Sequence, residues 1–170
     1  FHPPQLRSAE VFQFDKKNSM KKHSPEWWEA LTPQEAGKET EVMVQDVFKK
    51  WNSRTDFAWH RIPDSRASRG RLPAQPADFL YRCGRNSGFL EVKALDHPFR
   101  LTRARLTQLP MLRKWTMAGG DDLVLVHHYL KQTWRLVLVS CLEPQLPSWD
   151  LSCHAEFTDP ESALKALGLF

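Results

Sequence analysis

The alternation of apolar and polar positions along the chain predicts helices and short strands in a mixed order. Thr32-Pro33-Gln34-Glu35 is typical of a capping box, and apolar residues at helical spacing follow it to about Trp51. Apolar runs separated by turn-forming residues predict five strands, at 57–62, 77–82, 89–94, 122–129 and 133–140. A second helix is expected within 103–118, with Pro110 in its first turn or at a kink, and a last short one at about 160–167.

The order of these elements, α-β-β-β-α-β-β, predicts an α/β fold in which helices flank a mixed β-sheet of about five strands. We expect an N-terminal arm at residues 1–23, extended or poorly ordered, followed by one domain at residues 24–170. Ser24-Pro25 opens a short turn that carries Trp27 and Trp28. These two side chains are expected to pack against the body of the protein, or alternatively to form an apolar patch for self-association.

Composition narrows the class of protein. No apolar stretch is long enough to span a bilayer and no secretory signal is visible, so we expect a soluble protein without membrane contact. The cysteines, Cys83, Cys141 and Cys153, lack C-x-x-C spacing, which argues against a disulfide scaffold or a structural zinc site. The expected compartment is a reducing cytoplasm, in a bacterial or phage-infected cell.

Positive charge is concentrated in the middle of the chain. Residues 60–114 hold twelve basic and four acidic residues, a local net charge of +8, whereas residues 1–59 are balanced and residues 119–170 carry −4. Such a cluster is expected of a protein that holds a polyanion, and nucleic acid is the expected partner. The expected phosphate contacts are three arginines of the predicted loop 63–76 and two further along the chain: Arg66, Arg69, Arg71, Arg103 and Arg105.

Two carboxylates and an ammonium group stand where two predicted strands pair. The strand period of two places Glu91 and Lys93 on one face and Leu90 and Val92 on the other. Buried charge is costly unless something compensates it. A Mg²⁺ ion held by Asp78, Glu91 and the Val92 carbonyl, with Lys93 beside a bound water, would supply that compensation. The alternative is an ordinary surface ion pair between Glu91 and Lys93 on a solvated sheet face.

A third carboxylate is expected near these groups. On the first long helix, Glu41 lies on the same face as the apolar positions Val44 and Phe48. It could hold a metal-bound water or a second ion. By contrast, alternation sends His127 and His128 to opposite faces of their strand, so joint ligation of one metal by this pair is not expected.

These residues together resemble the PD-(D/E)XK nuclease superfamily, and within it the RecU-type and archaeal-type Holliday junction resolvases. Glu41 matches the acidic residue of the first helix, four positions after Gly37, and Asp78 matches the motif aspartate. Ala77 stands where the family often has proline. The remaining matches are Glu91-Val92-Lys93 for the E-x-K motif, Phe99-Arg100-Leu101 with Gln108, and Gly119-Gly120 before an apolar strand, so that the likeness spans about 37–140.

The resemblance implies roles for these residues and an activity for the chain. Asp78 and Glu91 would be metal ligands, Lys93 catalytic, Glu41 a metal-site carboxylate and Gln108 a supporting polar group. Ser68 falls where the archaeal type carries a serine near the scissile phosphate. The implied function is that of a Mg²⁺-dependent, structure-selective DNA endonuclease, a homodimeric Holliday junction resolvase in which Mn²⁺ can substitute. The alternatives are a restriction or repair nuclease of the same superfamily, and a non-catalytic DNA-binding module on the same fold.

Overall fold

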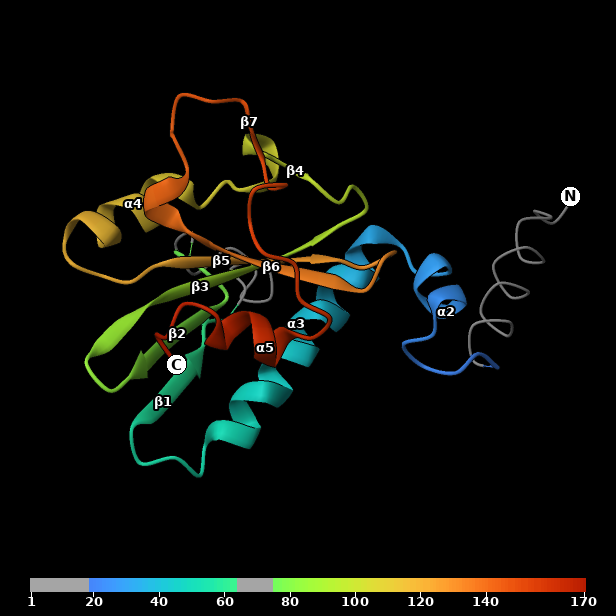
Figure 1. Ribbon diagram of the computed structural model, residues 1–170, viewed down its shortest axis with the longest axis horizontal. Helices are drawn as coiled ribbons and strands as arrows, with labels where there is room; N and C mark the ends of the chain where they lie inside the picture. The colour runs from blue at the N-terminus through green and yellow to red at the C-terminus, as the bar shows by residue number, and fades with distance from the viewer. Residues whose placement is uncertain (1–18, 64–74) are drawn as a thin grey trace, which may run out of the picture.

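The computed structural model describes residues 19–63 and 75–170. Its main sheet has five strands, and Figure 1 shows this sheet at the centre of the fold. The strand order is β1-β2-β3-β5-β6, with β3 and β5 parallel and the other neighbours antiparallel. The bounds are Phe57–Arg61 for β1, Phe79–Cys83 for β2, Asn86–Leu95 for β3, Leu123–His128 for β5 and Thr133–Leu138 for β6. The predicted α/β fold with a mixed sheet of five strands flanked by helices is confirmed.

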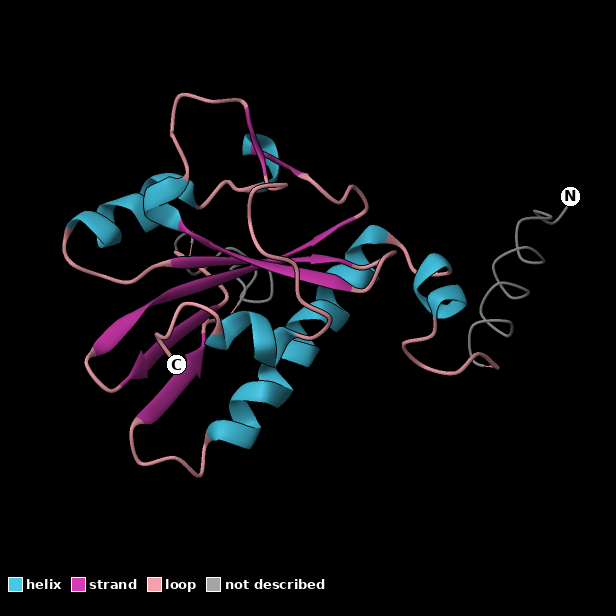
Figure 2. Cartoon of the chain, in the orientation of Figure 1, coloured by secondary structure: helices cyan, strands magenta, loops and turns pink. Residues whose placement is uncertain are grey.

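Helices cover both faces of this sheet (Figure 2). The long helix α3 (Pro33–Trp51) and the short α5 (Pro160–Lys165) lie on one face, and α4 (Leu109–Met117) lies on the other. A further short helix, α2 (Pro25–Glu29), precedes α3. The predicted helix within 103–118 is a single 3-10 turn, η1 (Arg103–Arg105), followed by α4, and Pro110 lies in the first turn of α4 as expected.

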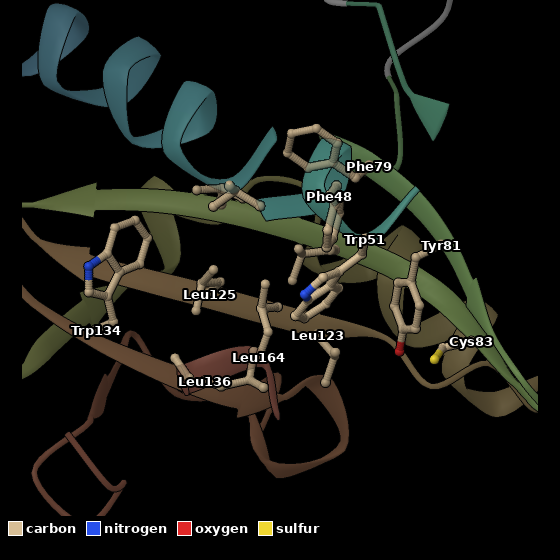
Figure 3. Packing of buried hydrophobic residues seen from close by; sticks show 14 of the residues in the cluster. Phe48, Trp51, Phe79, Tyr81, Cys83, Leu123, Leu125, Trp134, Leu136 and Leu164 are labelled. Carbon is tan, nitrogen blue, oxygen red and sulfur yellow. The ribbon is translucent and has the colours of Figure 1, made fainter. Parts of the chain in front are cut away.

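The core consists of two main clusters separated by the sheet. Leu123 and Leu125 of β5 pack in the cluster that contains Phe48 and Leu164, as Figure 3 shows. Val124 and Val126 of the same strand pack in the second cluster, which contains Leu109 and Leu112 of α4. A strand buried on both faces reads as a continuous apolar run, and this is why β5 is an uninterrupted LVLV sequence.

The start of α3 follows its sequence signature. The N–H of Glu35 donates to the Thr32 hydroxyl at 3.3 Å, and the N–H of Thr32 donates to the Glu35 carboxylate at 2.9 Å. This is the reciprocal pair of a capping box, so the predicted helix start is confirmed. The cap fixes where α3 begins and therefore which of its residues face the sheet.

Some features differ from the sequence-based expectations. Two three-residue strands, β4 (Arg100–Thr102) and β7 (Ser148–Asp150), form a separate small sheet that no pattern predicted. The alternative of an exposed Trp27–Trp28 patch is wrong, because Trp27 is only 9% exposed and Trp28 is fully buried against His127. Most of the predicted N-terminal arm lies outside the described residues, so the division into arm and domain stays a prediction.

Candidate active site

Asp78 forms hydrogen bonds both with the residue that follows β1 and with β3. It directly precedes β2, and its main-chain carbonyl accepts a hydrogen bond from the N–H of Ile62 at 2.8 Å. Its carboxylate accepts a second one from the N–H of Val92 at 2.7 Å. Because Phe79 pairs with Leu90 in the antiparallel register, the next position places Asp78 beside Glu91. The predicted convergence of these two residues on adjoining strands is therefore observed.

Glu91 is fully buried, which contradicts the alternative of a solvated surface ion pair. One of its oxygens, Oε1, forms an ion pair with the Lys93 ammonium. The other, Oε2, has no hydrogen-bond partner among the described residues. Lys93 keeps 21% of its side chain exposed and thus connects the buried carboxylate with solvent. The predicted strand period is observed. Leu90 and Val92 pack in the cluster that contains Phe48 of α3, and so they lie on the face of β3 opposite to Glu91 and Lys93.

Glu41 reaches the same region from α3. Its Oε2 accepts a hydrogen bond from the Arg61 guanidinium at the end of β1, at 2.8 Å. The Glu41 side chain is 25% exposed. Its negative charge also acts on the two strand carboxylates, because it contributes to raising the pKa of both Asp78 and Glu91. Three carboxylates, from α3, from β3 and from the position before β2, therefore interact electrostatically at one place.

The two strand carboxyls are poorly solvated. Burial raises the pKa of Asp78 well above its ordinary value, and the negative charges of Glu91 and Glu41 raise it further. Burial also raises the pKa of Glu91, and the neighbouring Lys93 opposes that shift. Ionising both groups is therefore unfavourable without additional positive charge. A bound cation is one source of such charge.

A cleft of about 190 Å³ opens at this place. It is lined by two cationic, two acidic, two amide and three apolar side chains: Lys38, Arg61, Glu41, Asp78, Gln75, Gln108, Ile62, Pro63 and Ala77. Glu41, Asp78 and Gln108 were expected near the site from the sequence. Lys38 and Arg61 were not, although Lys38 precedes Glu41 by one helical turn and this spacing could have indicated it.

The types of ligand atom at the site suit a metal ion, but their arrangement does not form a complete metal site. Carboxylate oxygens suit a hard cation such as Mg²⁺, and Glu91 offers an unpartnered one. However, no group of three or more His, Cys, Asp or Glu side chains in the described ranges is arranged to hold a metal. Arg61 binds Glu41, Lys93 binds Glu91, and Val92 contributes its N–H to Asp78. The residues fit the ion in kind: Oε2 of Glu91 is unpaired within the described part of the chain, and Oε1 would become available to the ion if Lys93 left it.

The remaining predicted residues lie elsewhere. Arg103 and Arg105 are on η1 and do not line the cleft; Arg105 instead pairs with Asp96 at 3.3 Å. Arg66, Ser68, Arg69 and Arg71 fall outside the described residues, and their roles stay predictions.

The two neighbouring histidines of β5 have separate partners. His127 bonds to the Thr40 hydroxyl at 2.8 Å, and His128 bonds to the Asp96 carbonyl at 2.8 Å. The expectation that they face opposite sides of their strand is confirmed.

Comparison with known proteins gives a distant likeness in structure and no match in sequence. No protein-family model matches the chain, and no curated protein matches it. Among solved structures, the chain is similar to Hjc of Archaeoglobus fulgidus, a Holliday junction resolvase from an archaeal hyperthermophile. The TM-score is 0.45 and the identity 19%, over 71% of this chain and 94% of that one. The likeness is too distant to assign a site or an activity. Within residues 19–63 and 75–170, every helix is too short or too polar to span a bilayer.

Proposed function

We propose that this protein is a Mg²⁺-dependent endonuclease that hydrolyses phosphodiester bonds in DNA. The observation that carries the proposal is the buried Glu91, whose Oε2 lacks a partner while Asp78 and Glu41 add negative charge beside it. Buried carboxyls with raised pKa values cluster at functional sites. The net charge of +8 over residues 60–114 suits a polyanionic substrate.

Asp78 and Glu91 would hold the ion, with Glu41 and the main chain at Val92 completing its surroundings. The bound ion would supply Lewis acidity toward a phosphate and an activated water. Lys93, released from Glu91, would orient that water or offset the charge that develops on the phosphate. Lys38 and Gln108 line the cleft and would contact the phosphate oxygens. Such preorganised donors and charges contribute most where charge builds up in the transition state.

We further propose that the substrate is branched DNA and that the protein resolves four-way junctions. The sequence resemblance through Glu41, Asp78 and Glu91-Val92-Lys93 supports this finer proposal. Symmetric cutting of two opposed strands requires two equivalent sites, which a two-fold homodimer would provide.

The test compares three DNA substrates with one protein preparation. Wild-type protein with Mg²⁺ or Mn²⁺ should cut a four-way junction faster than a linear duplex or a flap, and chelator should abolish cutting. Glu91→Gln and Lys93→Ala should each remove most of the cleavage while leaving DNA binding in place. Equal cutting of all three substrates would defeat the junction proposal, and unchanged cleavage by both variants would place the active site elsewhere.

A second candidate function is DNA binding without cleavage. The observation in its favour is that each carboxylate of the site already has a protein partner, in Arg61, Lys93 or the Val92 N–H. In that case the three acids would hold β1, β3 and α3 together. A wild-type protein that binds DNA but cuts no substrate with either metal would support this function over the first.

A further inference from the structure

A basic groove lies beside α4, separate from the cleft that holds Asp78. It has a volume of about 380 Å³ and is formed by η1, α4 and the segment after β6. Its lining residues are Arg103, Leu109, Pro110, Arg113, Lys114, Met117 and Pro144. Among these, three are basic and none is acidic, so the groove suits an anionic ligand.

The cations of the groove have no ion-pair partner among residues 19–63 and 75–170, and one of them is oriented by a main-chain carbonyl. The Arg113 guanidinium donates to the carbonyl of Leu142 at 2.7 Å, which orients the group without neutralising its charge. The main-chain N–H of Arg103 donates to the carbonyl of Pro147 at 2.9 Å and fixes the start of η1. Arg103 and Lys114 form no ion pair with any residue in the described ranges, unlike Arg105, which pairs with Asp96.

Between these cations the groove offers an apolar surface. Pro110, Met117 and Pro144 contribute most of it, and Met117 is 85% exposed, whereas Leu109 is only 2% exposed. A large apolar side chain left so accessible beside these cations suits a ligand with charged and apolar parts. A nucleic acid strand is such a ligand, since its phosphates alternate with sugars and its bases have apolar faces.

The groove and the cleft adjoin along the chain. Gln108 lines the cleft, and the next two residues, Leu109 and Pro110, line the groove. A polymer that left the cleft over the start of α4 would reach the groove. We propose that the groove binds the sugar–phosphate backbone of the DNA strand that leaves the cleft, with Arg103, Arg113 and Lys114 on its phosphates. The choice of DNA as the ligand rests on the proposed function.

The proposal is tested by DNA binding in chelator, where cleavage plays no part. The variant Arg103→Ala/Lys114→Ala is compared with Arg85→Ala/Lys131→Ala, which removes two cations from turns outside the groove. Fluorescence anisotropy with labelled single-stranded, duplex and four-way junction DNA gives Kd at several salt concentrations. The groove variant should bind roughly tenfold more weakly, and on single strands its log–log salt slope should be smaller by about 1.4, for two lost phosphate contacts.

The outcomes separate this proposal from the proposed function. A groove variant whose affinity and salt slope match those of the control variant overturns the proposal, even if the wild type cleaves DNA. A wild type that binds DNA through the groove yet never cleaves it overturns the nuclease function and leaves the groove assignment intact. Intact circular dichroism and thermal melting of both variants exclude misfolding as the cause.

Discussion

The N–H of Val92 donates a 2.7 Å hydrogen bond to the carboxylate of Asp78, across the pairing of β2 and β3. This bond holds Asp78 against the segment that carries Glu91 on one side of Val92 and Lys93 on the other. The acidic residue before β2 and the E-x-K sequence of β3 are therefore one rigid unit. A small displacement of either strand would move all three functional groups together.

The first prediction concerns the pH dependence of stability without metal. The pKa values of Asp78 and Glu91 are raised in the folded state, so their favourable contribution is complete below their unfolded pKa values and is lost as pH rises through the folded ones. In chelator, the free energy of unfolding of Asp78→Asn should therefore fall less with rising pH than that of the wild type. The two slopes should differ by at most about 1.4 kcal/mol per pH unit, the value for one carboxyl. Urea unfolding of both proteins between pH 4 and pH 8, a range of about four units, measures it. Parallel curves would contradict the burial of an ionisable Asp78.

The second prediction concerns stabilisation by metal. Because a cation binds the ionised carboxylates, the Tm increase on adding Mg²⁺ or Mn²⁺ should grow with pH. Asp78→Asn and Glu91→Gln should abolish the increase. Glu161→Gln is the matched control, since Glu161 lies outside the cleft in ion pairs with Lys50 and Lys165 and has its pKa lowered to about 2. Equal metal-induced shifts in all variants would place the ion away from the site.

The third prediction concerns Lys93. Its removal leaves the fully buried Glu91 without its ion-pair partner, which costs stability unless the carboxyl takes up a proton. We expect Lys93→Met to lower the free energy of unfolding at neutral pH by about 2 kcal/mol, less than for a wholly buried pair since Lys93 is partly exposed. Lowering the pH should restore part of the loss. Denaturant titrations at two pH values measure it, and a loss that is independent of pH would point to packing rather than charge.

The fourth prediction concerns the close approach of β3 to the start of β5. A Cβ on Gly88 would lie 2.5 Å from the main-chain oxygen of Asp121, so the backbone would have to move. Gly88→Ala should cost about 1–3 kcal/mol. Gly37 of α3 is the matched control, because a Cβ there meets nothing within 4 Å. Gly37→Ala should instead stabilise the helix by about 0.5–1 kcal/mol, and equal effects at the two positions would contradict the geometry.

Local patterns explain which parts of the fold the sequence could predict. The capping box of α3 and the alternation around Glu91 are encoded within a few neighbouring residues, whereas β3 begins at Asn86, three residues before the predicted start. The pairing of β4 with β7 joins Arg100 to Asp150, and three-residue strands so far apart carry no pattern of their own. Such pairings depend on tertiary packing rather than on local propensity.

The same distinction applies to the candidate site. Asp78, Glu91 and Lys93 were predictable because strand period and hairpin register place them together. The contact of Arg61 with Glu41 joins β1 to α3 across twenty positions, and only the packing of that helix on the sheet creates it. The ion pair between Arg105 and Asp96 was likewise not predictable, since a free arginine and a paired one look alike in a sequence, and the phosphate contact expected of Arg105 stays a prediction.

The most direct measurement of the central claim is anomalous X-ray scattering from crystals soaked with Mn²⁺. The ion should give a peak within ligand distance of the carboxylates of Asp78 and Glu91, with Lys93 moved away from Glu91, and the peak should vanish in Asp78→Asn crystals. Crystals that bind Mn²⁺ only elsewhere, with Lys93 still on Glu91, would contradict the account.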